Sequence, residues 1–284
     1  MRLRTMTNRD IPAGLLLNSV AGWNQTASDW QRFLDASPDG CFVAEIDDRV
    51  CGTATTISYE QRFAWIGMVL VDPDYRKRGV GTHLLRKAVE YLDQRGIPTM
   101  KLDATPQGQP IYEKMGFVTE YQIERWILKK PPDQTGKPAQ SDFAALTEDQ
   151  LLGILEKDRD VFGADRSQLL RSLHGENPDL TIGLSDQDIL RGYALGRRGS
   201  FADHLGPWMA EGSTAAEKLI HEFLARSSRE TIIVDCLTEN SFAMKLLREC
   251  QFVRSRSLTR MYRGPNASPG DPDSLCAILG PEFG

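Results

Sequence analysis

Residues 63–85 read F-A-W-I-G-M-V-L-V-D-P-D-Y-R-K-R-G-V-G-T-H-L-L, and this stretch decides how the rest of the chain is interpreted. Its first part, residues 64–71, is a short apolar run typical of a buried strand. The run ends at Asp72-Pro73, a turn signal. From Val80 onward the apolar residues recur at the spacing of a helix. The stretch therefore predicts a strand, a tight turn and a helix in that order.

The predicted turn combines positive charge with glycine, in the order Arg76, Lys77, Arg78, Gly79 and Gly81. Glycine lets the backbone approach a ligand closely, and the free N–H groups of a helix N-terminus attract anions. The combination predicts a pyrophosphate-binding turn. It is neither a P-loop nor a dinucleotide fingerprint, because no G-x-x-x-x-G-K-[ST] occurs and a leucine stands where the third glycine would be.

The spacing Arg76-x-x-Gly79-x-Gly81 resembles the acyl-CoA-binding signature of the GNAT acyltransferase superfamily. Taken alone, it is equally compatible with a glycine-rich turn that carries a solvated basic face. A second segment, I-Y-E-K-M-G-F at residues 111–117, resembles the pattern that ends the second cofactor-binding helix of the superfamily. Because both segments occur in the expected order and context, we interpret the N-terminal half as a GNAT domain.

The resemblance implies an α/β (α+β) fold in which each of two GNAT-like domains is a mixed, mostly antiparallel sheet flanked by helices. We expect the acetyl-CoA-binding domain at residues 1–130 and a Pro/Gly-containing linker at 131–140. A divergent GNAT-like domain is expected at residues 141–264, followed by a tail at 265–284 whose apolar run 275–279 docks on the body.

The resemblance also implies the cofactor, acetyl-CoA, and the way it is held. A free backbone N–H on the strand at residues 68–70 would face the thioester carbonyl, with Leu70 as the candidate oxyanion donor. Residues 69–71 would bind the pantetheine arm and residues 78–82 the pyrophosphate. Thr105 stands where the family usually has an asparagine, which puts one hydrogen bond to the pantetheine in doubt. The full predicted cofactor set is Met68, Val69, Leu70, Val71, Arg76, Lys77, Arg78, Gly79, Val80, Gly81, Thr82, Thr105, Gly108, Tyr112 and Lys114.

Tyr112 falls where the family places the tyrosine that protonates the CoA sulfur, and a phenol suits a thiolate leaving group as general acid. The alternative is that Tyr112 only packs against the sheet. The general base is less defined: Asp103 is the candidate, and Glu60, Glu45 or a water chain are alternatives. For the acceptor pocket we expect aromatic lining from Trp23, Tyr59 and Trp65, although core packing competes with that role.

Composition excludes several function classes. The 284 residues carry a formal net charge of −5 with a pI near 5.5, which argues against nucleic acid or an anionic membrane as the main partner. The five cysteines are scattered and never form C-x-x-C, so we expect no disulfide framework, no metal site and a reducing cytoplasm. No apolar run is long enough to span a membrane.

The order of elements expected in the second half echoes the last part of the first half, and Asn240, Ala243 and Leu246 keep the family's Asn-x-x-Ala-x-x-Leu spacing. Other positions depart from the family: Leu247 replaces the tyrosine, and Glu211 aligns with Arg76. We therefore expect a second GNAT-like fold without the chemistry, which would shape the acceptor pocket, bind a regulator or complete a shared sheet. Its loop charges Asp160, Asp165 and Arg166 would either reach the first domain's cleft or serve as helix caps and surface pairs. A tandem of this kind would also allow one chain to replace a dimer.

These patterns predict an acetyl-CoA-dependent N-acetyltransferase. The acceptor would be a primary amine of a small molecule or peptide that attacks the thioester directly in a ternary complex. An acyl-cysteine route is not expected, because neither Cys41 nor Cys51 is placed beside the thioester. The alternative is a non-catalytic acyl-CoA-binding sensor or regulatory protein.

Overall fold

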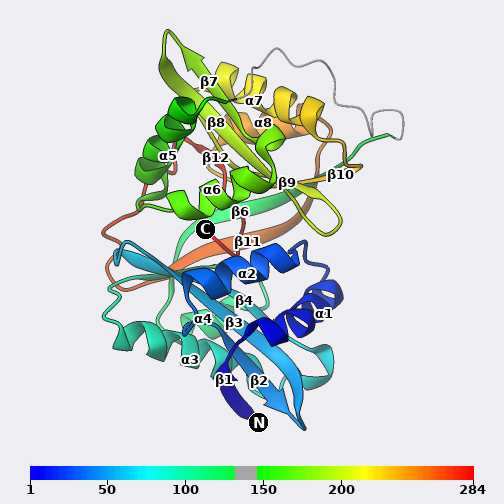
Figure 1. Ribbon diagram of the computed structural model, residues 1–284, viewed down its shortest axis with the longest axis vertical. Helices are drawn as coiled ribbons and strands as arrows, with labels where there is room; N and C mark the ends of the chain where they lie inside the picture. The colour runs from blue at the N-terminus through cyan, green and yellow to red at the C-terminus, as the bar shows by residue number, and fades with distance from the viewer. Residues whose placement is uncertain (132–145) are drawn as a thin grey trace. The chain divides into compact units, whose positions relative to one another are not determined.

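The computed structural model describes residues 1–131 and 146–284, which form two compact units (Figure 1). Unit 1 consists of Met1–Thr119, Met261–Ala267 and Glu282–Gly284, and unit 2 of Glu120–Arg260 and Ser268–Pro281. Apart from residue 131, the expected linker at 131–140 lies outside the described residues.

Unit 1 is a sheet flanked by helices, as its sequence predicts. Its strands follow the order β1-β2-β3-β4-β5, with residues 261–263 of β11 beside β5. The pairings are antiparallel except for β4 and β5, which run parallel. The bounds are β1 (Arg2–Thr5), β2 (Phe42–Ile46), β3 (Arg49–Tyr59), β4 (Phe63–Val71), β5 (Met100–Ala104), α1 (Ile11–Ala21), α2 (Ala27–Ala36), α3 (Val80–Gln94) and α4 (Gln109–Glu113).

Tight turns set the register of the meander β2-β3-β4. Asp47 and Asp48 join β2 to β3 with φ of 51° and 58°, and Glu60 and Gln61 join β3 to β4 with φ of 48° and 60°. Two consecutive residues with positive φ are the mark of a type I′ turn, whose twist matches that of the flanking strands.

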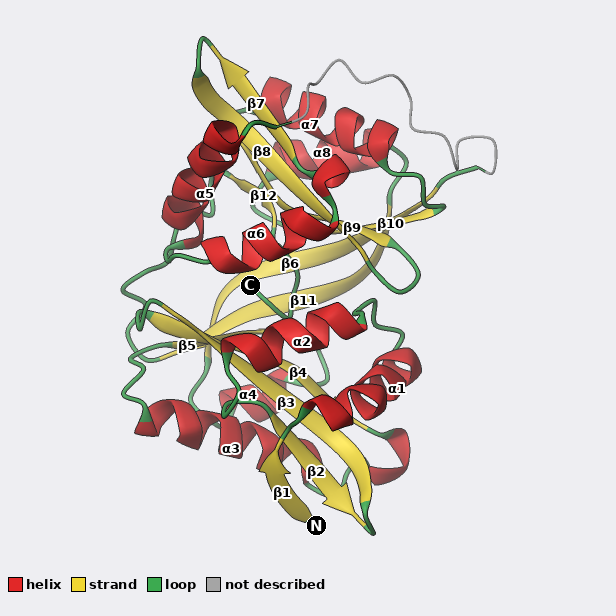
Figure 2. Ribbon diagram, in the orientation of Figure 1, coloured by secondary structure: helices red, strands yellow, loops and turns green. Residues whose placement is uncertain are grey.

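The two faces of the sheet in unit 1 are covered by different helices (Figure 2). Leu84 and Leu85 of α3 pack in one cluster with Ala64 and Ile66 of β4. Since side chains alternate along a strand, Trp65 and the position of residue 67 belong to the opposite face. In Figure 2, α1 and α2 lie in front of the strands of this unit. Strand β4 therefore lies between two helical layers.

Unit 2 has the same architecture. Its strands follow the order β11-β6-β10-β12-β9-β8-β7, with residues 253–260 of β11 in this unit. The bounds are β6 (Val118–Lys129), β7 (Ile182–Asp186), β8 (Ile189–Arg198), β9 (Asp203–Ala210), β10 (Thr231–Leu237), β11 (Val253–Arg263), β12 (Leu275–Ala277), α5 (Glu148–Phe162), α6 (Ser167–Glu176), α7 (Ser213–Arg226) and α8 (Ser241–Glu249).

The two units repeat one another in detail, which confirms the second GNAT-like fold. In unit 1 a Cβ on Gly52 would lie 2.9 Å from Leu84 of α3, and in unit 2 a Cβ on Gly192 would lie 2.8 Å from Leu219 of α7. Each glycine thus lets a leucine of the following helix sit directly on its strand. This match pairs Leu84 with Leu219, the alignment expected from the sequence.

The spatial units differ from the expected sequence ranges in two places. Strand β6, which follows the I-Y-E-K-M-G-F segment, pairs along most of its length with β10 in unit 2. Residues 261–267 and 282–284, expected in the second domain and its tail, lie in unit 1. The sequence patterns predict the order of elements along the chain. They do not predict these strand pairings, because the paired residues are far apart in the sequence.

A buried charge network crosses the strands of unit 2. Arg125 on β6 donates two hydrogen bonds to Asp235 on β10, at 2.7 and 2.6 Å, and Nε2 of His204 on β9 lies 3.1 Å from the same carboxylate. Burial alone would raise the pKa of Asp235, but the charge and hydrogen bonds of Arg125, with His204, hold it well below its usual range. Burial lowers the pKa of His204. The network therefore depends on an ionised Asp235.

We predict that Asp235→Asn lowers the free energy of unfolding by about 3–5 kcal/mol, because it leaves the Arg125 guanidinium buried without its counter-charge. Urea denaturation at neutral pH measures the change. A depressed carboxyl pKa stabilises the fold above its unfolded value of about 3.9 and loses this effect as the pH falls. The wild type should thus be more acid-sensitive than the variant. The exposed pair Lys245–Glu249 supplies the control, Glu249→Gln, expected to cost less than about 1 kcal/mol; equal losses would contradict the prediction.

Candidate functional site

A β-bulge interrupts β4 at the centre of the predicted site. Thr53 of β3 pairs with Leu70 and Thr55 pairs with Gly67, so Met68 and Val69 together face one residue of β3. Met68 has φ of 50°, and its carbonyl accepts a 2.8 Å hydrogen bond from the hydroxyl of Thr53. Bulges bend a strand and redirect its groups, and they are common next to active sites. The bulge lies on the strand segment that the sequence assigns to the thioester.

Strands β4 and β5 separate just before the bulge. Within the described residues they pair only at Ala64 with Met100 and at Trp65 with Lys101. Beyond Trp65, the β5-facing edge of β4 carries N–H and C=O groups that β5 does not take up. Such an edge can bind an extended ligand as a further strand. The N–H of Asp72 donates to the carbonyl of Cys51 on β3 at 2.9 Å, and Leu70 is in register with Thr53. Since residues alternate between the two edges of a strand, Val69 and Val71 direct their backbone groups to the β5 side, whereas Leu70, the predicted oxyanion donor, directs its N–H toward β3.

The turn after β4 leads into the N-terminus of α3. Nε of Arg76 donates a 3.0 Å hydrogen bond to the carbonyl of Val71, which ties the turn to the end of β4. Gly79 has φ of 80° at the N-cap of α3, and no side chain caps the helix. The Arg78 guanidinium lies over the Tyr75 ring, 5.4 Å from its centroid. The first N–H groups of α3 are therefore left for an anion beside a row of exposed cations.

The same turn holds the other predicted phosphate contacts. A Cβ on Gly81 would lie 3.4 Å from Val71, so the start of α3 packs closely on the end of β4. Lys77 is exposed with φ of 61°, Thr82 is half-buried, and Val80 is buried in the core under α3. Because its side chain is buried, Val80 can contribute only its backbone N–H to the binding of an anion. Backbone contacts of this kind are what the sequence predicts for residues 78–82.

Tyr112 lies in the short helix α4 and is half-buried. Its ring meets Phe117 edge-on at 6.2 Å, and a Cβ on Gly108 would lie only 2.9 Å from the ring. Burial raises the pKa of Tyr112 to about 12. The phenol therefore stays protonated at neutral pH, the state that a donor to a thiolate requires.

Three other predicted residues have simpler surroundings. The Thr105 hydroxyl accepts a 3.2 Å hydrogen bond from the N–H of Gly108, so it shapes the entry to α4. Lys114 is exposed at the end of α4, and Asp103 is half-buried on β5. The role of Asp103 as general base stays a prediction.

The alternative bases are engaged elsewhere. Glu45 accepts a 2.7 Å hydrogen bond from Arg4. Glu60 lies in the β3–β4 turn with a carboxylate 3.4 Å from Arg62. Neither carboxylate belongs to the strands that form the opening between β4 and β5.

The predicted pocket aromatics do not share one environment. Trp23 is half-buried after α1, whereas Tyr59 and Trp65 are only 3% and 1% exposed. The Tyr59 hydroxyl donates a 2.8 Å hydrogen bond to the carbonyl of Phe283. In this conformation Tyr59 and Trp65 pack within the protein. Core packing is the alternative to pocket lining that the sequence left open.

The loop charges of the second half take the structural roles. Asp160 lies inside α5, and the carboxylate of Asp165 accepts a 2.7 Å hydrogen bond from the N–H of Ser167 at the start of α6. Arg166 is buried and donates from Nε to Asp158 at 2.8 Å. Helix capping and ion pairing, rather than a reach toward another cleft, explain Asp165 and Arg166.

In unit 2 the place that matches the opening between β4 and β5 is filled by the chain itself. Strands β9 and β10 pair in parallel over residues 203–205 and 232–234, and β12 then lies between them. Ala277 of β12 is in register with both Trp208 and Cys236. The Asn240 amide, which keeps the family's cofactor-contacting position, donates instead to the carbonyl of Leu275 at 3.2 Å.

Unit 2 also lacks the basic turn. Residues 72–79 connect β4 to α3, whereas only residues 211–212 connect β9 to α7. Glu211, aligned with Arg76 in the sequence, lies 3.1 Å from Arg191 and 3.4 Å from Lys157. These ion pairs lower the pKa of Glu211, and the hydrogen bond from Arg191 has the largest effect. A carboxylate at this point is unfavourable for a pyrophosphate.

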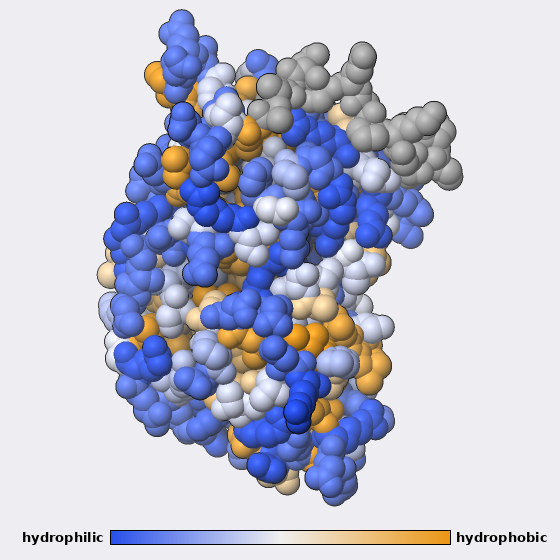
Figure 3. Space-filling model, viewed as in Figure 1, coloured by the Kyte–Doolittle hydropathy of each residue, from blue (hydrophilic) through white to orange (hydrophobic). Residues whose placement is uncertain are grey.

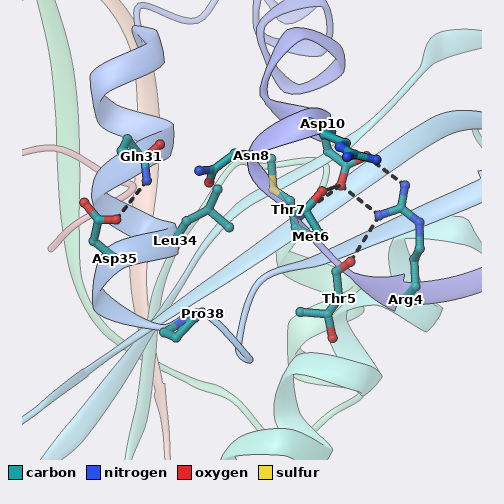
Figure 4. A pocket seen from close by; sticks show the side chains of 11 residues that line it. Arg4, Thr5, Met6, Thr7, Asn8, Asp10, Gln31, Leu34, Asp35 and Pro38 are labelled. Atoms are coloured by element: carbon teal, nitrogen blue, oxygen red, sulfur yellow. Dashed lines mark hydrogen bonds and ion pairs between the residues drawn. The ribbon is translucent and has the colours of Figure 1, made fainter.

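A hollow of about 790 Å³ in unit 1 is separate from the predicted cofactor residues (Figure 4). It lies between the segment that follows β1 and helix α2. Four of its polar side chains are already paired, Arg4 with Asp10 at 2.7 Å and Gln31 with Asp35 at 2.8 Å. Its lining is Arg4, Thr5, Met6, Thr7, Asn8, Arg9, Asp10, Gln31, Leu34, Asp35 and Pro38. We do not assign the cofactor to this hollow.

Two family profiles match the chain. The "Acetyltransferase (GNAT) family" matches residues 15–117, and an "Acetyltransferase (GNAT) domain" matches residues 154–277. The chain belongs to the GNAT acetyltransferases. It is a tandem protein with one GNAT domain in each half, and it is a GNAT N-acyltransferase that uses an acyl-CoA donor and an amine acceptor.

Similar proteins share the tandem length. Holothin acyltransferase of Pseudoalteromonas sp. (strain SANK 73390) is 25% identical over 92% of this chain and 87% of its own. The uncharacterized N-acetyltransferase YitH of Bacillus subtilis (strain 168) is 27% identical over 67% of this chain and 66% of its own. The crystal structure of a putative acetyltransferase from Pyrococcus horikoshii superposes with a TM-score of 0.82 at 25% identity, covering 100% of this GNAT protein and 95% of the other chain.

The surface and the cysteines of the residues that the structure describes can be compared with the expectations from composition. The face shown in Figure 3 is mainly hydrophilic, with smaller hydrophobic areas. None of the helices in the described residues has both the length and the apolar character needed to cross a bilayer. All five cysteines are free thiols. Across residues 1–131 and 146–284, no group of three or more His, Cys, Asp or Glu could hold a metal ion.

We predict that Lys77→Glu weakens acetyl-CoA binding about tenfold or more, about 1.4 kcal/mol, because it reverses a charge beside the N-terminus of α3. Isothermal titration at low salt measures the Kd. Lys218→Glu is the matched control, since Lys218 is an exposed lysine on α7, the helix of unit 2 that corresponds to α3. Equal weakening by both variants would show only a general effect of net charge and contradict the assignment.

Proposed function

We propose that unit 1 transfers the acetyl group of acetyl-CoA to a primary amine of a small molecule or peptide, by direct attack in a ternary complex. The observation that carries the proposal is the bulge of β4 beside its separation from β5. One continuous surface of unit 1 thereby combines unpaired strand edge, helix N-terminus and basic turn. This combination suits a thioester with a nucleotide tail.

The proposed chemistry assigns a task to each group. A free backbone N–H within residues 68–70, beside the bulge, stabilises negative charge on the thioester oxygen as the neutral amine attacks its carbon. The C–N bond forms, the tetrahedral intermediate collapses, and the C–S bond breaks. Tyr112 gives its proton to the departing thiolate. The amine loses its proton to Asp103 or to water, and solvent exchange restores Tyr112.

The cysteines favour direct attack over an acyl-enzyme. Burial raises the pKa of Cys41 to about 12, and burial also raises the pKa of Cys51. Their thiols lie 3.5 and 3.4 Å from the carbonyls of Phe33 and Ala44. Because the thiolate is the nucleophile, two buried thiols of raised pKa are poor candidates for carrying an acyl group.

The names of two relatives agree with the proposed reaction. YitH carries the name of an N-acetyltransferase, which agrees with acetyl as the transferred group. Holothin acyltransferase carries the name of an acyltransferase, which agrees with the transfer of an acyl group. The identity of the amine in this GNAT protein does not follow from either name.

We predict that Tyr112→Phe lowers kcat about 100-fold or more, the usual effect of losing a general acid. The phenyl ring keeps the packing on Gly108 and Phe117, so the Kd of acetyl-CoA should stay the same. Release of CoA thiol with a panel of primary amines measures kcat. Full cofactor binding by the wild type with no turnover on any amine would favour the acyl-CoA sensor instead. An unchanged kcat in the variant would remove Tyr112 from the mechanism.

We predict one acetyl-CoA per chain, because β12 occupies the matching place in unit 2. Isothermal titration of the intact chain gives the stoichiometry. The Asn240→Ala variant should retain one site and the same Kd, since its amide contacts the β12 carbonyl rather than the cofactor. Two equivalents per chain would contradict this assignment.

A further inference from the structure

Residues 282–283 cover β4 directly beside the bulge. A Cβ on Gly67, the residue before Met68, would lie only 2.6 Å from the backbone carbonyl of Glu282. The Phe283 ring stacks on Phe33 of α2 with centroids 4.7 Å apart and planes 17° from parallel. Both residues belong to unit 1, although they follow β12 of unit 2 closely in the sequence.

This contact lies on the face of β4 that is opposite α3. Ala64 and Ile66 face the α3 side, so alternation turns the Gly67 position toward the α1 and α2 side. The proposed cofactor runs from the β4 edge to the start of α3. An amine that attacks the thioester at the bulge therefore has the other face as its approach, which is the face that residues 282–283 border.

Several interactions hold this segment in place. Glu282 is 2% exposed and Phe283 is 0% exposed. The Tyr59 hydroxyl donates to the Phe283 carbonyl at 2.8 Å, and the stack on Phe33 fixes the ring. Moving the segment would break both interactions and expose a phenyl ring to water. The contact thus has the properties of a fixed wall rather than of a mobile plug.

Gly67 is explained by the same contact. Its φ is not positive, so the backbone conformation alone does not demand glycine. The 2.6 Å approach to a backbone atom does, because the Glu282 carbonyl has no flexible end that could move away. The sequence of β4 is therefore adapted to the presence of residues 282–283.

We propose that residues 282–283 form the acceptor-side wall of the acyl-transfer site. The wall excludes water from the bound thioester and narrows the entry of the amine, and Tyr59 and Phe283 act as positioning residues that hold it. The inference rests on the proposed function of unit 1. Tyr59 then acts on the acceptor side through its hydrogen bond to the carbonyl of Phe283, and not by contacting the amine directly.

The test measures hydrolysis of bound acetyl-CoA in the absence of amine, with full-length chain in excess over the thioester. Phe283→Ala should raise the single-turnover hydrolysis rate about tenfold, because water reaches the thioester once the wall is loosened. Tyr59→Phe, which removes only the hydrogen bond, should raise the rate by a smaller factor. The Kd of acetyl-CoA should stay within about twofold of the wild type in both variants.

Tyr193→Phe is the matched control. Tyr193 is a buried tyrosine of unit 2 whose hydroxyl donates a 2.7 Å hydrogen bond to the carboxylate of Asp158. This variant removes a tyrosine hydrogen bond within unit 2, so hydrolysis should match the wild type. Thermal unfolding checks each variant, and Tyr59→Phe carries the test if Phe283→Ala does not fold.

Two results would contradict the proposal that residues 282–283 form the acceptor-side wall. One is normal acetyl-CoA binding with hydrolysis unchanged in the variants of Tyr59 and Phe283. The other is an equal rise in the Tyr193 control, which would indicate general loosening. Absence of acetyl-CoA binding to the wild type is a different failure: the titration reveals it before any rate is measured, and it would overturn the proposed function and this inference with it.

Discussion

The site of this GNAT protein depends on one constraint, that β4 must stop pairing with β5 after Trp65. A parallel pair that continued would use the β5-facing N–H and C=O groups of this part of β4 in a ladder. The bulge at Met68 and Val69 bends β4 at this point, and the Thr53 hydroxyl fixes the carbonyl of Met68. The basic turn and α3 then follow from the end of the bent strand.

Unit 2 meets the same constraint in a different way. Its parallel strands β9 and β10 also separate, but β12 pairs with both of them, and the amide of Ile278 donates to the carbonyl of Asp235 at 3.0 Å. The short connection 211–212 leaves no room for a basic turn. One fold thus appears twice in the chain, with an open strand edge in unit 1 and a peptide along that edge in unit 2.

Local patterns predicted most elements, because turns and helices depend on nearby residues. The turn signal Asp72-Pro73 and the helical spacing from Val80 are of this kind. Strand β9 was not predicted, since Gly206-Pro207 interrupts its apolar pattern. The pairing of β12 and the contact of Phe283 with Tyr59 join residues remote in sequence, and no local pattern reports them. The Arg76-x-x-Gly79-x-Gly81 motif predicted the cofactor residues as a group. The burial of Tyr59 and Trp65 could be recognised only from the packed structure.

The strand β12 has a consequence for how the second unit responds to its surroundings. A tethered segment competes with free molecules at an effective concentration of about the millimolar range, whatever the dilution of the protein. A diffusing nucleotide would have to displace strand pairing and the Asn240 hydrogen bond together. A free thioester that approaches this edge of the second unit thus meets a competitor that dilution of the protein does not remove.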